Sequence, residues 1–215
     1  MKIKLLAITM LVLSGICTGL YAQQISGSLS GTLGPGTYTV VGDCRVESGQ
    51  TLDIEPGTVF QHRGFYKWNI SGTLNAVGNA DSLIEFVREQ PIQAHKWGGI
   101  RFDGAGSSNS VLDYCYIADC DSSDRPGGGI FANYADITVR NSVITRCFSG
   151  DGGGIYADHS NIVIDNCEIS HCSAFIFRTG SHQGTNGNGG GVYLYYCNAP
   201  RIYDSFIHNN YSQGA

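Results

Sequence analysis

Charged side chains are scarce in this sequence: they make up 14% of its 215 residues, against about 25% in an ordinary globular protein. Long solvent-exposed helices depend on such side chains, so their scarcity argues against a helical protein. The chain instead holds 30 glycines, and Asn, Ser, Ile, Val and Tyr are frequent. These residues are typical of short strands joined by tight turns, and they predict an all-β protein.

Positive charge is also in short supply, with 13 Lys and Arg against 18 Asp and Glu and a formal net charge of −5. Removal of a leader that contains Lys2 and Lys4 takes away two positive charges and brings the net charge to −7. Nucleic acids and anionic membranes attract positively charged surfaces, so we expect neither as a partner.

The chain begins with a segment typical of an export signal. Lys2 and Lys4 precede an apolar run over residues 5–16, and small residues lead to Ala22. This predicts a signal peptide over residues 1–22, too short to span a membrane. Lipidation at Cys17 is the alternative, although Ile16 stands where a small residue normally precedes a lipidated cysteine. We therefore expect a secreted protein with no transmembrane segment in this part of the chain.

A repeat organises the remaining residues. The motif GGI or GGV starts at Gly98, Gly128, Gly153 and Gly190. A second block follows each motif and aligns without gaps over residues 110–120, 137–147, 162–172 and 200–210. One column of this alignment holds Leu112, Val139, Ile164 and Ile202, and another holds Ile117, Ile144, Ile169 and Ile207. Polar residues alternate with these, as in half-buried strands, so stacked units are expected to bury the apolar columns.

The repeats resemble those of right-handed parallel β-helix proteins, the fold of pectate lyases and polygalacturonases. The pairing of GGI with a strand that ends in Asn or Cys is similar, more narrowly, to the repeat of polymorphic outer membrane proteins. FIHN at residues 206–209 matches the F-x-x-N of that repeat, whereas the other units depart from it. The segments EPGT, SGTLNAVG and WGGIRFDG resemble the leading part of exported bacterial β-helices. The resemblance implies a single-chain right-handed β-helix solenoid.

This fold predicts a simple division of the chain. Residues 23–97 form an amino-terminal cap and the first coils, and residues 98–215 form the repeats, with an inserted loop at 175–188. Residues 212–215 stand where the next GGI motif would be introduced, so we expect the solenoid to be truncated at its carboxyl end.

Cys167, Glu168, His171 and Cys172 have a spacing that could suit a metal ion. Neighbouring side chains of an extended strand point to opposite faces, so they would not converge. Cys120, Cys147 and Cys172 also share one alignment column, and Cys115, Ser142, Cys167 and Ser205 share another. We interpret both columns as small residues at tight internal corners, with disulfides as the alternative, and expect no metal or cofactor.

The glycine motifs do not predict a phosphate-binding loop, because no Lys-Ser or Lys-Thr follows them. We interpret them as bends between coils that require positive φ.

The outward face of the GGI strands carries the candidate binding residues. Alternation predicts a row of Arg101, Phe131, Tyr156 and Tyr193, and beside it a row of Asp103, Asn133, Asp158 and Tyr195. Exposed aromatic rings can contact sugars or proteins, although stacking between coils would also explain them. Arg178 and His182, in the inserted loop, are further candidates because such loops often carry specificity.

Asp103 and Asp158 are the candidate catalytic pair. They lie two coils apart, about 9.6 Å at the usual strand spacing, near the upper limit for the carboxylates of an inverting glycoside hydrolase. The clustered aspartates that the β-helix lyases and hydrolases use are absent from this strip, so catalysis within these residues is not expected.

Together these observations predict a β-helix exposed on the outer surface of a Gram-negative bacterium, or secreted from it, that serves in adhesion or recognition. Its expected partner is an extracellular polysaccharide, or the surface of a host or neighbouring cell. Two alternatives stay open: a polysaccharide lyase or glycoside hydrolase with its catalytic residues largely in a missing carboxyl-terminal part, and a structural spacer.

Overall fold

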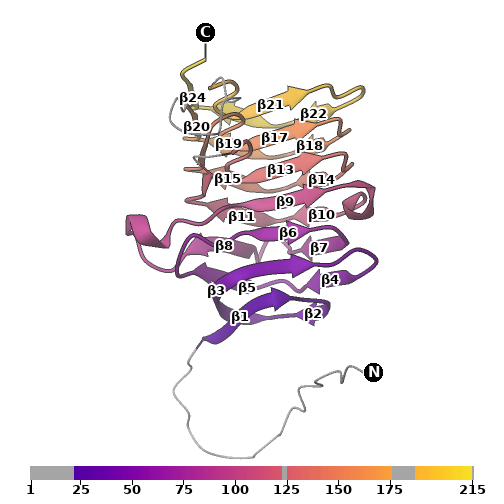
Figure 1. Cartoon of the computed structure of the whole chain (residues 1–215), viewed down its shortest axis with the longest axis vertical. Helices are drawn as coiled ribbons and strands as arrows, with labels where there is room; N and C mark the ends of the chain where they lie inside the picture. Colours follow the sequence, from indigo (N-terminus) through magenta and orange to yellow (C-terminus); the bar gives the residue numbers. More distant parts are fainter. Residues whose placement is uncertain (1–21, 123–124, 176–186, 215) are drawn as a thin grey trace, which may run out of the picture.

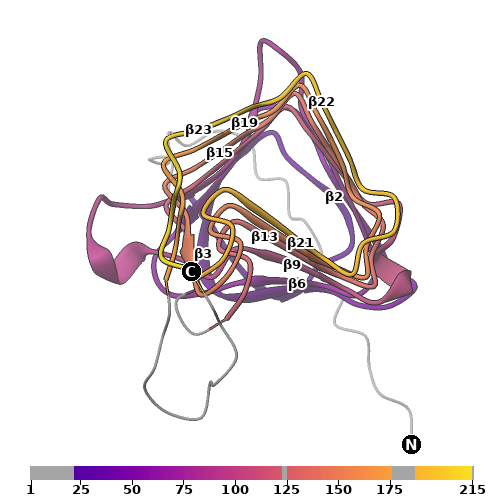
Figure 2. The same ribbon diagram turned by 90° about the horizontal axis from the view of Figure 1, so that it is seen from above.

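The computed structural model describes residues 22–122, 125–175 and 187–214. Within these ranges the chain winds into a stack of coils (Figure 1), and each coil is triangular when viewed along the stack (Figure 2). The strands of successive coils pair in parallel. The all-β fold expected from the sequence, a parallel β-helix, is confirmed.

The three sides of the triangle are three faces of the solenoid, and a short ladder lies at one corner. The first face consists of β6 (Trp68–Ile70), β9 (Ile100–Asp103), β13 (Ile130–Asn133), β17 (Ile155–Asp158) and β21 (Val192–Tyr195). The second face consists of β2 (Gly31–Leu33), β4 (Thr51–Ile54), β7 (Thr73–Val77), β10 (Val111–Asp113), β14 (Thr138–Arg140), β18 (Val163–Asp165) and β22 (Arg201–Tyr203). The third face consists of β5 (Thr58–His62), β8 (Ile84–Arg88), β11 (Cys115–Ala118), β15 (Val143–Thr145), β19 (Glu168–Ser170) and β23 (Phe206–His208). The short ladder consists of β12 (Asp121–Ser122), β16 (Phe148–Ser149), β20 (Ser173–Ala174) and β24 (Tyr211–Ser212).

The amino-terminal end joins two of these faces. Strand β3 (Gly36–Val46) pairs with β5 through its first half and with β6 through its last residues, and β1 (Gln23–Ser28) pairs with β3. Two short 3-10 helices, η1 (Gln93–His95) and η2 (Ala105–Ser107), project from the coils. No helix in the described ranges is long and apolar enough to cross a membrane.

The apolar columns expected from the alignment form the core. Leu112, Val139 and Ile164 are strand partners in three successive coils, and each is fully buried. Ile202 continues this column in the last described coil and is 41% exposed. A core residue is therefore buried by the coils above and below it, as nearest-neighbour stacking requires.

Single residues in the left-handed conformation form the corners of the triangle. Eleven of the twelve described non-glycine residues with positive φ fall into three columns at equivalent places in successive coils. The corner between the first and second faces contains Tyr134, His159 and Tyr196. The corner between the second and third faces contains Tyr114, Asn141, Asn166 and Asp204. The corner between the third face and the short ladder contains Asp119, Arg146, His171 and Asn209. Each such residue costs about 1–2 kcal/mol in backbone strain. It persists because its N–H still donates to the next coil, as from Asn141 to the carbonyl of Asp165 at 3.0 Å.

The GGI glycines have a second role besides the expected bend. In three of the four motifs the positive φ belongs to the preceding glycine (Gly127, Gly152 or Gly189), and the GG pair itself does not adopt it. The pair is required because coils approach too closely for a side chain: a Cβ on Gly154 would lie 2.6 Å from the carbonyl oxygen of Gly191. The expected positive φ is therefore found at the glycine before the pair in these three motifs and at Gly99 in the first motif, whereas close backbone approach selects the other glycines.

Replacement of Gly153 by Ala tests this account. A Cβ there would meet the carbonyl oxygens of Gly190 and Ser173, which are backbone atoms that cannot turn away. We expect Gly153→Ala to lower the free energy of unfolding by about 3 kcal/mol, measured by urea denaturation. Gly64→Ala is the matched control, because its Cβ would meet only the side chain of Tyr66. Equal stability of the two variants would contradict the close-approach explanation.

A buried histidine sits among aromatic rings near the amino-terminal end of the core. His62 is fully buried and stacks on Trp97, with ring centroids 4.0 Å apart. Its Nδ1 donates to the carbonyl of Val87 at 2.9 Å, and its Nε2 accepts from the indole N–H of Trp68 at 3.1 Å. Both ring nitrogens are thus satisfied in the neutral form. Burial lowers the pKa of His62 from 6.5 to about 3.

This pKa makes stability depend on pH. Below pH 6.5 the unfolded chain gains a proton at His62 that the folded chain does not bind. The stabilisation is therefore complete above pH 6.5 and is lost as the pH falls toward 3, by up to about 1.4 kcal/mol per pH unit. Urea denaturation between pH 6.5 and 5, above the range where most carboxylates titrate, measures this slope. His62→Gln should remove its share of the slope; an unchanged slope would show that His62 is not responsible.

Candidate functional site

The four residues with the spacing of metal ligands lie on opposite sides of the solenoid wall. Cys167 and Cys172 are buried inside, whereas Glu168 is half-buried on the outer side and His171 is exposed at a corner. The carboxylate of Glu168 accepts from the hydroxyl of Ser170 at 2.9 Å. Within the described ranges no three His, Cys, Asp or Glu side chains gather as metal ligands. The four residues therefore belong to the coil architecture.

The cysteine and serine columns line the corners. Each residue of these columns directly follows a residue in the left-handed conformation. Its thiol or hydroxyl donates to the backbone carbonyl two residues earlier, from Cys172 to Ser170 at 3.3 Å and from Ser142 to Arg140 at 2.6 Å. A serine in these columns can also accept a hydrogen bond: Ser142 Oγ accepts from the N–H of Cys115 at 2.9 Å. All seven cysteines of the described ranges are free thiols, and six of them are buried. The corner interpretation agrees with this geometry.

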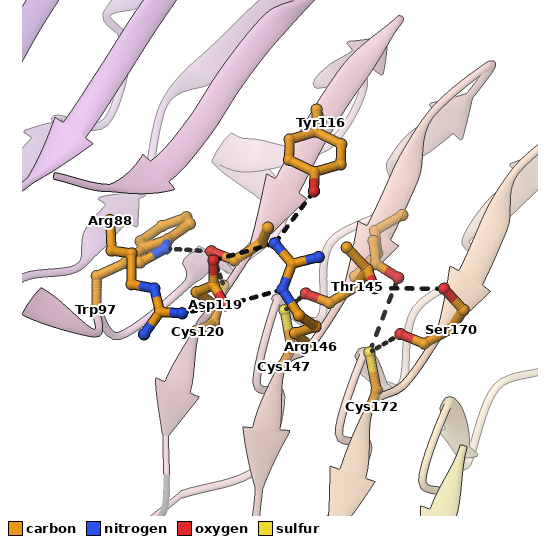
Figure 3. A network of polar contacts seen from close by, with 12 residues as sticks. Arg88, Trp97, Tyr116, Asp119, Cys120, Thr145, Arg146, Cys147, Ser170 and Cys172 are labelled. Atoms are coloured by element: carbon orange, nitrogen blue, oxygen red, sulfur yellow. Dashed lines mark hydrogen bonds and ion pairs between the residues drawn. The ribbon is translucent and has the colours of Figure 1, made fainter. Parts of the chain in front are cut away.

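A charged network surrounds the corner beside the cysteine column (Figure 3). Asp119 is 8% exposed and pairs with Arg88 at 3.3 Å and with the Nε of Arg146 at 3.0 Å. Arg146 also donates to the hydroxyl of Tyr116 at 3.1 Å. Hydrogen bonding to Asp119 raises the pKa of Arg146 further above its usual value. The two guanidinium groups compensate the negative charge of the buried Asp119 carboxylate, so this network holds the corner of the coil in place.

The outward rows expected on the first face are present in the expected register. Arg101, Phe131, Tyr156 and Tyr193 are successive strand partners, as are Asp103, Asn133, Asp158 and Tyr195. Asp103 and Asp158 accordingly lie two coils apart, with Asn133 between them. Asp103 accepts from the amide of Asn133 at 2.7 Å, and Asp158 contacts the Nδ1 of His159 at 2.5 Å.

The faces of the inner rings in this row are already occupied. The guanidinium of Arg101 lies 4.0 Å from the centre of the Phe131 ring. Tyr156 stacks on Phe131 with centroids 5.6 Å apart and planes inclined by 7°. Tyr156 is only 8% exposed. Neither ring has a face free to lie flat against a sugar, so stacking between coils accounts for Phe131 and Tyr156.

A polar hollow opens at the lower part of the same face. It has a volume of about 270 Å³, and its lining comes from β6, β9, β13 and the loops beside them. The lining consists of Asn69, Ile70, Ser71, Arg101, Asp103, Arg125, Phe131 and Asn133. Amide, hydroxyl, carboxylate and guanidinium groups thus converge beside one aromatic edge. Arg101 is held in place by donation to the carbonyl of Pro126 at 3.1 Å.

Sequence reasoning found some of these residues and missed others. Alternation identified Arg101, Phe131 and the row that begins with Asp103. It did not identify Asn69, Ser71 and Arg125, which lie outside the aligned blocks. It also missed the corner column of Tyr134, His159 and Tyr196. The candidates Arg178 and His182 lie outside the described residues.

Comparison with known proteins identifies a family. The sequence model of the family described as "Right handed beta helix region" matches residues 45–215. No curated protein and no solved structure shows significant similarity to the chain.

Thiol reactivity tests the corner cysteines. Burial raises the pKa of Cys115, Cys120 and Cys147 above that of a free thiol, which suppresses the reactive thiolate. We expect the folded protein to react rapidly with an aromatic disulfide reagent only at Cys197 among the described cysteines. Unfolding without reductant should expose all seven of them.

Cys197→Ser should abolish the rapid reaction of the folded protein at the described cysteines. Fewer than seven described thiols after unfolding would mean that disulfides form in the columns.

Proposed function

The chain belongs to the right-handed β-helix family, and from this premise we propose that it is an exported bacterial surface protein whose first face recognises glycans. The polar hollow beside Arg101 and Asn133 carries this proposal. Sugar hydroxyls both donate and accept hydrogen bonds, and the hollow offers both kinds of partner within one small volume. The segment at residues 1–22, with the pattern of an export signal, supports a location where extracellular polysaccharide is met.

The size of the hollow favours recognition of a short part of a glycan. At about 270 Å³ it lies at the lower end of the range of small-molecule sites. It opens on a flat, rigid sheet, along which a longer chain can extend. The strand register holds Arg101, Phe131 and Asn133 in place through pairing with the coils on either side.

Asn133→Ala tests the hollow. The variant removes one amide from the lining and the hydrogen bond to Asp103. We expect binding to a responsive glycan, identified on a panel of neutral and acidic polysaccharides, to weaken about tenfold, which corresponds to one or two hydrogen bonds. Isothermal titration calorimetry measures the change.

Asn75→Ala is the matched control. Asn75 makes an equivalent bond to Asp53, at 2.8 Å, on the second face. Equal weakening by the two variants would place recognition elsewhere. Sugar release during incubation, abolished by Asp103→Asn or Asp158→Asn, would replace the binding role by the enzymatic alternative.

A further inference from the structure

A second feature of the first face lies higher in the stack, where aromatic rings surround Asp158. Two ring columns flank the row of Asp158: one contains Phe131, Tyr156 and Tyr193, and the other contains Tyr134, His159 and Tyr196. Tyr195, the strand partner of Asp158 in the next coil, links the columns. Its ring centroid lies 6.1 Å from that of Tyr193 and 4.3 Å from that of Tyr196. The rings thus form a continuous border on both sides of one carboxylate and above it.

The ring faces in this border are not equally available. In the lower coils the rings are nearly parallel and cover one another, as Tyr134 and His159 do at 4.6 Å and 14°. Between the last described coil and the one below it, Tyr193 is inclined to Tyr156 by 62°, whereas Tyr196 stacks on His159 at 27°. Within the last described coil, Tyr195 is inclined to Tyr193 by 36° and to Tyr196 by 70°. Tyr195 is 40% exposed and Tyr196 is 66% exposed. We call Tyr193, Tyr195, Tyr196 and Asp158 the open aromatic cluster.

The open aromatic cluster carries one formal negative charge, on Asp158, whose carboxylate also contacts the Nδ1 of His159. Asp158 is the acidic residue within it, and strands β13, β17 and β21 contain no Lys or Arg. Hydrogen bonding to Tyr196 raises the pKa of Tyr195, and the carboxylate of Asp158 acts in the same direction. Burial raises the pKa of Tyr156, with Asp158 as the next cause. The strand register agrees with these directions, because Asp158 is the partner of Tyr195 in the adjacent coil.

We propose that the open aromatic cluster binds a small organic cation that carries a quaternary ammonium group. Inclined aromatic faces beside a carboxylate attract such a cation through the negative ring faces and through direct charge attraction. This site is distinct from the glycan hollow and does not depend on it.

The same chemistry selects against other cations. A divalent metal ion needs several oxygen ligands, whereas the cluster offers one carboxylate. A primary ammonium is strongly hydrated and loses more on contact with aromatic rings than a methylated one does. Methyl groups around a diffuse charge contact ring faces without leaving a hydrogen-bond donor unpaired.

Titration with choline, followed by NMR at pH 8, tests the proposal. We expect saturable binding with a dissociation constant in the millimolar range, as a few exposed cation–π contacts allow. The neutral isostere 3,3-dimethylbutan-1-ol has the same shape without the charge, and it should bind at least about tenfold more weakly. Equal binding of the two compounds, or no saturable binding of choline, would overturn the proposal.

Variants locate the site. Asp158→Asn and Tyr195→Ala should each weaken choline binding about five- to tenfold. Tyr203→Ala and Tyr211→Ala are matched controls, because these tyrosines are 47% and 54% exposed on other sides of the same coil. They should leave binding unchanged, and an equal loss in a control would also refute the assignment. Circular dichroism and thermal unfolding confirm that each variant is folded.

Discussion

The left-handed residue at each corner is the constraint on which the rest of the structure depends. From β10 onward one or two residues turn the chain between the second and third faces, as Tyr114 does between β10 and β11. At the corner between the first and second faces only four residues separate β13 from β14, so each coil is short and its successor falls into register above it. The turn is strained for a residue with a side chain. It is tolerated because backbone bonds continue through it, and because a small Cys, Ser or Ala follows it inside the bend at every corner except that of Asn209, where Asn210 follows.

This arrangement separates the inner and outer surfaces of the chain. Inside, columns of Ile, Leu and Val fill the triangle, and the cysteines occupy its corners against the GGI glycines: a Cβ on Gly129 would lie 3.2 Å from the sulfur of Cys147. Outside, the register places similar residues above one another, so aromatic rings stack and amides hydrogen-bond between successive coils. Asn166 donates to Asn141 at 2.8 Å in this way. In a column of identical residues, each side chain therefore has its neighbours in the column as interaction partners.

The alternation in the repeats was enough to predict the fold and the register of both apolar columns. The corners were not predicted, because Tyr114, Tyr134 and Arg146 carry no local signal of positive φ; tertiary contacts impose it on them. The close approach of coils at the glycine pairs was missed for a related reason, since a sequence does not distinguish a bend from a close approach. For the candidate site, alternation predicted which residues point outward. It could not predict that stacking would bury Tyr156 to 8% exposure or cover both faces of Phe131.

Binding sites on such a solenoid are expected where a column changes its residue type. Along the first row, Arg101 gives way to Phe131 between β9 and β13, and the polar hollow opens at that step. Along the second row, Asp158 gives way to Tyr195 between β17 and β21, and at this step Tyr193 is inclined to Tyr156 by 62°, whereas Phe131 and Tyr156 one coil below are almost parallel at 7°. At both steps a residue meets a partner of a different type in the adjacent coil, as the guanidinium of Arg101 meets the ring of Phe131. A change of residue type brings ring faces, amides and charged groups together at one place on the sheet, so the two proposed sites follow from interruptions of the same stacking that holds the coils together.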